Sequence, residues 1–300
     1  MSIPPLPEPG PGQAFCNVSA LEAGVLRLPC DYFVTSAKKG EFLIAPSLSF
    51  LITHAHTGDR LLFDLGIRKD IENSIKPLIQ RIDGMFKPSI PQDVSEALAR
   101  GGLTPTDITH ICLSHCHWDH VGNPALFTNA TFIVGGEARS LFQPGYPEDP
   151  KSIFASDLLP DGRTEFLDTK SWGPIGPFSK ALDYYGDGSL YIVDAPGHLP
   201  GHVNILVRTS SDGSWLYLAG DSAHDWRLVR GQGDITISHN AHGETICAHR
   251  DKEQAEITIK KIAGLMTLPR VRILLAHDYE WYAENKGGEA FWPGKISAEN

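Results

Sequence analysis

Short apolar runs recur along this 300-residue chain, and four of them end directly on a histidine or an aspartate. Each run has the length of a strand, and many are apolar on both faces, which is typical of sheets covered on both sides. The four ends read Ser114-His115, Val193-Asp194, Gly220-Asp221 and Ala276-His277. A strand that ends in a polar side chain holds that side chain in place. We therefore expect the four ends to converge at one edge of a packed pair of sheets.

Strand-like and helix-like segments alternate over most of the length. The pattern predicts strands at 42–53, 60–65, 108–113, 131–134, 190–193, 203–207, 215–219 and 271–275. It predicts helices at 67–82, at 92–100 and from Asp251 onward, where Gln254 completes a capping-box-like start. Pro77 predicts a kink or an early end of the first of these helices. This mixture favours a layered α/β or α+β domain.

Composition and charge exclude several classes of protein. The net charge of −10 disfavours a general nucleic-acid binder, and no run approaches the ~18 apolar residues of a transmembrane helix. Five cysteines without a CxxC disfavour a disulfide framework or a structural zinc finger. The proline-rich start lacks the features of a secretory signal, so we expect an extended, poorly ordered tail over 1–14, a single domain over 15–300, and a cytoplasmic location.

Residues 115–120, which read His-Cys-His-Trp-Asp-His, are the strongest functional signal. His115 and His117 are two residues apart and face the same way on an extended segment. Asp119 and His120 follow after a tight turn. Two imidazoles can hold one metal ion while a carboxylate and an imidazole hold a second, and these ligands suit zinc, with iron, manganese or cobalt as alternatives. The motif predicts a metal site.

Other histidines and the neighbouring cysteine carry weaker signals. His54 and His56 imitate the first pair but lack the Asp-His that follows it, so we interpret them as structural or exposed. Cys116 should point away from the metal, and no base is paired with it, which disfavours a nucleophilic role. Three further histidines precede the last predicted helix, either in solvent or in the wall of a pocket: His239, His242 and His249.

Taken in order, the polar strand ends resemble the metallo-β-lactamase superfamily. The family pattern H-x-H-x-D-H is followed by a distant Gly-His, an aspartate after a strand and a late histidine. The matching residues here are His115, His117, Asp119, His120, His198, Asp221 and His277. The resemblance covers roughly residues 40–280 and implies a four-layer αββα sandwich of the α+β class.

The resemblance also implies how the ligands are divided. His115, His117 and His198 would bind one Zn2+, and Asp119, His120 and His277 a second, with Asp221 bridging the two. Asp64 matches an early aspartate of the family that supports the site from outside. His202 competes with His198 for the third position, and the family pattern favours His198.

A bridging water between two such ions would be ionised near neutral pH and would attack an acyl carbon. Asp119 is both a ligand and a candidate proton carrier. The neighbourhood resembles the lactonase-like branch, in which acyl-homoserine lactonases often carry a tyrosine three residues after the bridging aspartate. This chain has His224 there, and a histidine can protonate the amide nitrogen that leaves an opened lactam.

The chain also resembles fungal lactam hydrolases that open benzoxazolinone-type plant lactams. We therefore expect a hydrolase of a small cyclic amide or carbamate, with a lactonase as the alternative, and a thioesterase or a mono-iron sulfur dioxygenase as further alternatives. The substrate is then a small molecule. Residues 84–88 could form a lip over the site, with an aromatic wall contributed by Phe142, Tyr146, Phe154 and Trp226.

Overall fold

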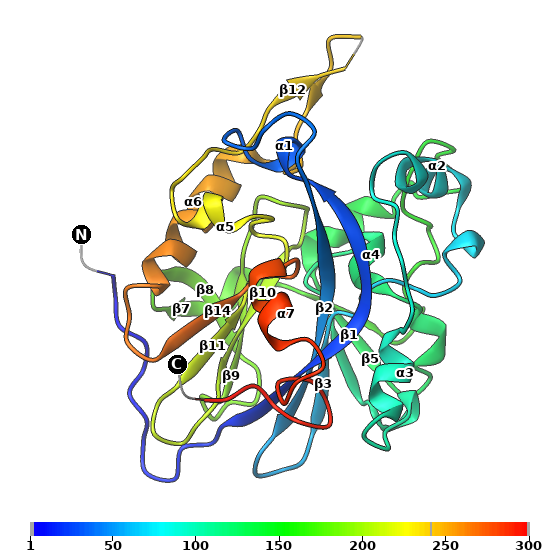
Figure 1. Ribbon diagram of the computed structural model, residues 1–300. Coiled ribbons are helices and arrows are strands. Elements are labelled where there is room, and N and C mark those ends of the chain that lie inside the picture. The colour runs from blue at the N-terminus through cyan, green and yellow to red at the C-terminus, as the bar shows by residue number, and fades with distance from the viewer. Residues whose placement is uncertain (1–2, 241, 299–300) are drawn as a thin grey trace.

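Two six-stranded sheets pack face to face, and helices cover their outer faces (Figure 1). The structure is a computed structural model that describes residues 3–240 and 242–298. Large apolar side chains from both sheets fill the space between them, among them Phe50, Phe63, Ile192, Ile205 and Leu218. This is the predicted four-layer sandwich of the α+β class.

The first sheet is mixed. Its order is β1 (Cys16–Pro29), β2 (Phe42–His54), β3 (Arg60–Phe63), β4 (His110–Cys112), β5 (Thr131–Gly135) and β6 (Thr164–Leu167). The first two pairings are antiparallel and the remaining three are parallel. Because parallel neighbours end at the same edge, the loops after β3 and β4 lie side by side.

The second sheet has the order β14 (Val271–Leu274), β11 (Trp215–Leu218), β10 (Val203–Arg208), β9 (Leu190–Asp194), β8 (Phe178–Asp183) and β7 (Gly173–Ile175). Only the pairing of β11 with β14 is parallel in this sheet. A separate hairpin, β12 (Ser238–His239) with β13 (Thr245–Ile246), projects away from the body (Figure 1).

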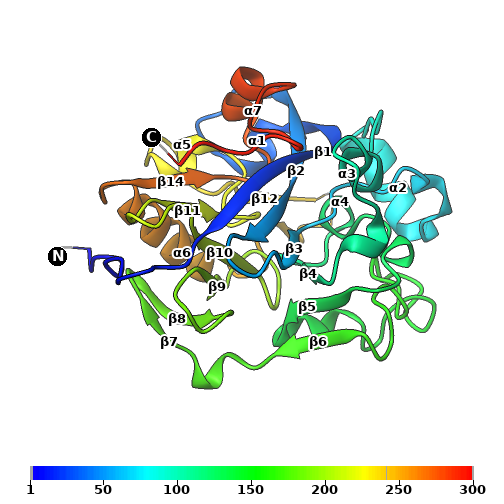
Figure 2. The same ribbon diagram turned by 90° about the horizontal axis from the view of Figure 1, so that it is seen from below.

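Helices form the outer layers (Figure 2). On the first sheet, α3 (Val94–Ala99) buries Val94, Ala97 and Leu98 in a cluster with strand residues. On the second, α6 (Lys252–Leu265) buries Ala255, Ile259 and Ile262. The other helices are α1 (Cys30–Phe33), α2 (Lys76–Met85), α4 (Trp118–Val121), α5 (Trp226–Val229) and α7 (Tyr279–Asn285).

Two local expectations differ from the structure, and one long strand was missed. Pro77 neither kinks nor shortens a helix: it lies in the first turn of α2, where its missing N–H would have had no partner. The segment before α2 is a short 3-10 turn, Ile71–Asn73, rather than the start of the same helix. The long strand β1 was not predicted, because its apolar alternation is interrupted by a register shift between Glu22 and Val25.

The N-terminal segment contacts the body of the domain. From residue 3 to residue 14 it forms no helix or strand. Leu6 is buried in the same cluster as Phe178, and the Pro7 carbonyl accepts a 3.0 Å hydrogen bond from Nη2 of the buried Arg208. The buried Leu6 side chain and the hydrogen bond from Arg208 thus hold this proline-rich segment against the domain.

Candidate metal centre

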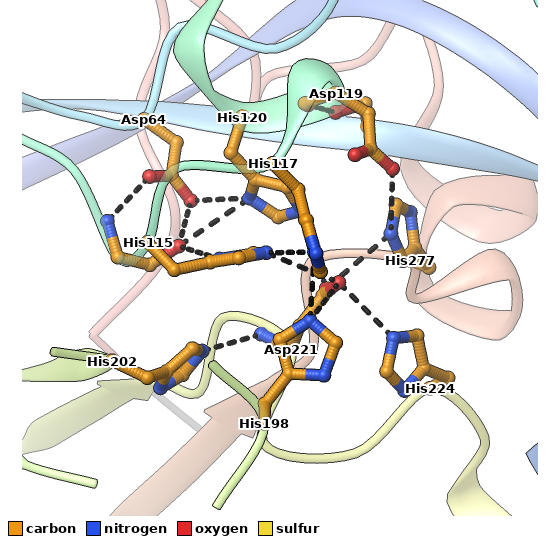
Figure 3. A network of polar contacts seen from close by, with 12 residues as sticks. Asp64, His115, His117, Asp119, His120, His198, His202, Asp221, His224 and His277 are labelled. Carbon is orange, nitrogen blue, oxygen red and sulfur yellow. Dashed lines mark hydrogen bonds and ion pairs between the residues drawn. The ribbon is translucent and has the colours of Figure 1, made fainter. Parts of the chain in front are cut away.

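Side chains from the segments that follow β3, β4, β9, β11 and β14 lie close together, among them Asp64, His115, His198, Asp221 and His277 (Figure 3). All seven residues that the sequence predicted as ligands lie there together. Six of them are buried, and His117 is half-buried at the entrance.

Three imidazoles and one carboxylate form the first group. Nε2 of His115 lies 2.9 Å, and Nε2 of His198 3.0 Å, from Nδ1 of His117. Oδ2 of Asp221 lies 3.5 Å from Nε2 of His198 and 3.7 Å from Nε2 of His115. The potential ligand atoms of these four residues all lie within 4.8 Å of one another.

The second group contains Asp119, His120 and His277, whose ligand atoms are equally close. Nε2 of His277 lies 3.5 Å from Oδ2 of Asp119. Oδ1 of Asp221 lies 3.3 Å from Nε2 of both His120 and His277. The two oxygens of Asp221 therefore face different groups, which is the placement expected of a bridging carboxylate.

Hydrogen bonds on the far side of the His120 and His277 rings fix which nitrogen of each points inward. Nδ1 of His120 lies 2.8 Å from Oδ2 of Asp64, and Nδ1 of His277 lies 2.8 Å from the Pro46 carbonyl oxygen. Asp64 also accepts hydrogen bonds from the backbone N–H and the hydroxyl of Ser114, at 2.6 and 2.7 Å. Such outer contacts hold imidazoles with Nε2 free for a cation.

The charges and unsatisfied atoms fit bound cations. Nε2 of His120 and Oδ1 of Asp221 are buried without a hydrogen-bond partner among the described residues. Burial lowers the pKa of His117 to about 3, and burial also holds the pKa of His115 and of His198 well below its usual value. Neutral imidazoles around one point offer lone pairs with no proton to share, which is the donor set that zinc prefers.

The pKa values of Asp119 and Asp221 are shifted in opposite directions. Burial raises the pKa of Asp119. Burial also acts to raise the pKa of Asp221, but His120, His224 and His277 outweigh it and hold that pKa well below its usual value. Asp221 is thus the more strongly anionic of the two carboxylates.

His202 stands behind the centre. Its Nε2 accepts a 3.1 Å hydrogen bond from the backbone N–H of Asp221, and it belongs to neither group. Burial lowers the pKa of His202 to about 3. A neutral His202 therefore supports the loop that carries Asp221.

His224 faces the centre from the side of Asp221. Its Nε2 lies 3.1 Å from Oδ2 of Asp221, and its ring stacks on Phe33 with 4.2 Å between centroids and 22° between planes. His249, which the sequence left open between solvent and a pocket wall, is buried beside it with 5.3 Å between the ring centroids. His239 is exposed in strand β12 and His242 in the loop that follows it.

A small cavity of about 50 Å3, the metal cavity, contains His117, Asp119, His198, Asp221, His224 and His277 in its wall. Phe86, from the predicted lip, also lines it, together with Tyr32, Phe33 and Trp118, which the sequence analysis missed. Tyr32 and Phe33 belong to α1, and no sequence motif marks so short a helix.

Only part of the predicted aromatic wall lines a cavity at this centre. Phe154 lines a pocket that adjoins it, whereas Trp226 packs in the core under the second sheet. Phe142 contacts Phe154 edge to face, with 6.3 Å between centroids. Tyr146 pairs through its backbone with Phe154 and lines neither cavity among the residues described.

Cys116 points away from the predicted ligands, as expected, and His54 and His56 lie outside the centre. Cys116 is buried in the core and lines a separate cavity of about 600 Å3 that contains none of the predicted ligands. Burial raises the pKa of its thiol to about 12. His54 is buried and lies 2.9 Å from Asp187, and His56 is exposed.

A comparison with models of protein families shows which superfamily this chain belongs to. A model of the metallo-beta-lactamase superfamily matches residues 44–245. The chain belongs to this superfamily. Like the fold, the family membership agrees with the resemblance seen in the sequence.

Several relatives of this superfamily member are informative. It is 33% identical over 322 residues to "Cytochrome P450 monooxygenase mpaDE'" of Penicillium brevicompactum, covering 99% of this chain but 37% of that protein. It is 34% identical to "Gamma-lactamase FDB1" of Fusarium pseudograminearum, covering 66% of this chain and 50% of that protein. The chain thus spans half or less of the length of these two relatives.

A solved structure shows the same fold. An N-acyl homoserine lactone hydrolase with the product N-hexanoyl-L-homoserine at its catalytic metal centre superposes with a TM-score of 0.69 at 19% identity, covering 93% of this chain and 98% of that one. In addition, none of the helices within the described ranges is both long and apolar enough to cross a membrane.

Proposed function

We propose that this chain is a dinuclear metal-dependent hydrolase that opens a small cyclic amide or carbamate. His115, His117 and His198 would hold one zinc ion, and Asp119, His120 and His277 the other. Asp221 would lie between the two ions. The support is the geometry of the donors: two compact groups of ligand atoms, with Nε2 of His120 and Oδ1 of Asp221 buried without a hydrogen-bond partner in the part of the chain that the structure describes, and with His120 and His277 held from outside by hydrogen bonds.

When bound, two such ions would supply Lewis acidity and lower the pKa of a bound water towards about 7. The chain itself must then position the substrate and handle the proton of the leaving group. The wall of the metal cavity is aromatic on one side, with Phe33 and Trp118, which suits a small flat ring.

The position of His224 favours a lactam over a lactone as the substrate. An amide nitrogen is a poor leaving group unless it is protonated as the ring opens, whereas the oxygen of a lactone leaves more readily. His224 lines the metal cavity and places Nε2 within 3.1 Å of Asp221, while Phe33 holds the plane of its ring. An imidazole there can donate a proton at the position where the leaving nitrogen would lie.

Asp119 is a second candidate for moving a proton. Its carboxylate lines the same cavity, and burial raises its pKa, so it takes up a proton more readily than Asp221. We assign it the proton of the attacking water and assign His224 the proton of the leaving group.

A lactonase is the second candidate function. It is favoured by the structural similarity to lactone hydrolases and by 30% identity over 210 residues to an N-acyl homoserine lactonase of Azorhizobium caulinodans. The gamma-lactamase relative is more similar in sequence, at 34% identity over 209 residues.

The test is a comparison of two ring openings by the zinc-loaded protein. We expect a higher kcat/KM for 2-benzoxazolinone, a cyclic carbamate, than for N-hexanoyl homoserine lactone. The reverse order would support the lactonase. If neither ring is opened by protein that carries two zinc ions, the proposed function is wrong.

A further inference from the structure

A second cavity adjoins the metal centre and has an unusual charge. It has a volume of about 430 Å3, and His117 and His198 line both this cavity and the metal cavity. Arg81 and Ile153 are also shared between the two. A substrate whose reacting bond lies at the metal centre therefore reaches directly into this second cavity.

The second cavity is basic although the chain is acidic. Its wall carries Arg81, Lys151 and Arg250, opposed by the single carboxylate of Asp149, in a chain with a net charge of −10. Within the ranges that the structure describes, none of the three basic side chains forms an ion pair. By contrast, Arg227 and Arg230 near the centre each pair with a carboxylate. We call this cavity the cationic pocket.

Part of its remaining wall is apolar, beside Ser140 and Ser152. Leu141, Ile153 and Phe154 line it, and the Phe154 ring lies nearly parallel to that of His117, with 6.1 Å between centroids and 13° between planes. A site with an apolar body and a few charged groups binds an organic molecule that has the same division.

We infer that the substrate carries a carboxylate away from the ring that is opened, and that Arg81, Lys151 and Arg250 bind it. This inference rests on the proposed function, and it narrows the substrate class to an anionic lactam or lactone with an apolar or aromatic body. The planar guanidinium fork of arginine matches a carboxylate with two parallel hydrogen bonds. Arg81 lies closest to the reacting centre because it also lines the metal cavity.

Binding of two matched probes tests the inference without turnover. Isophthalate and 3-carbamoylbenzoate share one carboxylate, and they differ in whether the second group is charged. By calorimetric titration of the zinc-loaded full chain, we expect isophthalate to bind at least about tenfold tighter, since a charge-assisted hydrogen bond is stronger than a neutral one.

Two triple variants locate the effect. The variant R81Q/K151Q/R250Q should lose the preference for isophthalate, with dissociation constants of the two probes within about threefold of each other. The variant K170Q/K260Q/K286Q removes the same charge from exposed positions outside the pocket and should keep the preference. Equal binding of the probes by the natural chain, or an unchanged preference in the first variant, would overturn the inference.

The outcome is separable from the proposed function. Loss of ring opening in a protein that still prefers isophthalate would refute the hydrolase and leave the cationic pocket intact. A working hydrolase without the preference would refute the pocket alone. As a check on folding, both variants should retain the zinc content and the thermal midpoint of the natural chain.

Discussion

Oδ2 of Asp64 lies 2.8 Å from Nδ1 of His120, and this contact leaves Nε2 as the nitrogen that His120 presents to the metal centre. The backbone of Asp64 is in the left-handed region, with φ of 61°. Few residues other than glycine, asparagine and aspartate adopt this conformation. The loop after β3 is therefore shaped to deliver one carboxylate to one imidazole.

Replacing this carboxylate should weaken one metal site. Asp64→Asn keeps the size of the side chain and tolerates the left-handed backbone, but it removes the charge that fixes His120. We expect the affinity for the second zinc ion to fall about 10- to 100-fold, measured by competition with a chromogenic chelator. Asp187→Asn, which breaks the similar contact with His54 outside the centre, is the control and should bind zinc like the natural chain.

His224 should affect lactams more than lactones. If His224 donates the proton to the leaving nitrogen, His224→Gln lowers kcat/KM for 2-oxindole, a benzo-fused γ-lactam in which nitrogen is the only leaving group, by at least about 100-fold, the usual effect of a general acid. The same variant should open a lactone with a loss below about tenfold, because an alkoxide leaves with less help. Equal losses on both substrates, at an unchanged zinc content, would assign His224 to binding alone. His56→Gln, at an exposed position, serves as the control.

The stability of the metal-free protein should fall on acidification. Burial lowers the pKa of His202 to about 3 in the folded state, below the usual value near 6.5 in the unfolded chain. The unfolded chain then binds more protons between these values, so the stabilisation is complete above about pH 6.5 and is lost as the pH falls towards 3. We expect the urea midpoint to decrease from pH 7 to pH 5.5.

A variant isolates the contribution of His202. His120 and His277 have raised pKa values, because the carboxylates around them outweigh the effect of burial, and they titrate in the opposite sense. Comparison of His202→Gln with the natural chain cancels the contributions of His120 and His277. The free energy of unfolding of the variant should change less steeply with pH, by up to about 1.4 kcal/mol per pH unit. Identical slopes would show that His202 is not a buried neutral imidazole.

Cys116 should be dispensable for the reaction. It lies between two predicted ligands in the chain, yet its thiol is buried in the core and has a pKa raised to about 12. Cys116→Ala should retain kcat within about twofold and cost about 1 kcal/mol of stability through the small cavity that it leaves. A loss of kcat of two or more orders of magnitude, with normal metal content, would instead point to a covalent role.

The metal centre was predictable because its ligands directly follow strand-like apolar runs in the sequence. His115, His117, Asp119 and His120 lie within one short motif, and the three distant ligands each follow an apolar run that forms a strand of the second sheet. The alternation of strands and helices similarly predicted most of both sheets. Neither prediction needed contacts between remote side chains.

Features that depend on such contacts could not be predicted. Strand β1 is stabilised by pairing with β2 along nearly its whole length and has no clean alternation of its own. Burial of Leu6 depends on a surface built by β7 and β8, 170 residues or so further along the chain. The cationic pocket combines Arg81 from the middle of α2 with Lys151 and Arg250 from two separate loops, and none of them belongs to a motif.

The number of zinc ions that the chain retains decides whether the two groups of side chains form a dinuclear site. If seven side chains hold two cations, the purified full chain, saturated with zinc and then dialysed, should retain two equivalents by elemental analysis. Asp221→Ala removes the carboxylate placed between the two groups and should retain at most one. Retention of no stoichiometric metal by the natural chain, or of two equivalents by Asp221→Ala, would contradict the account.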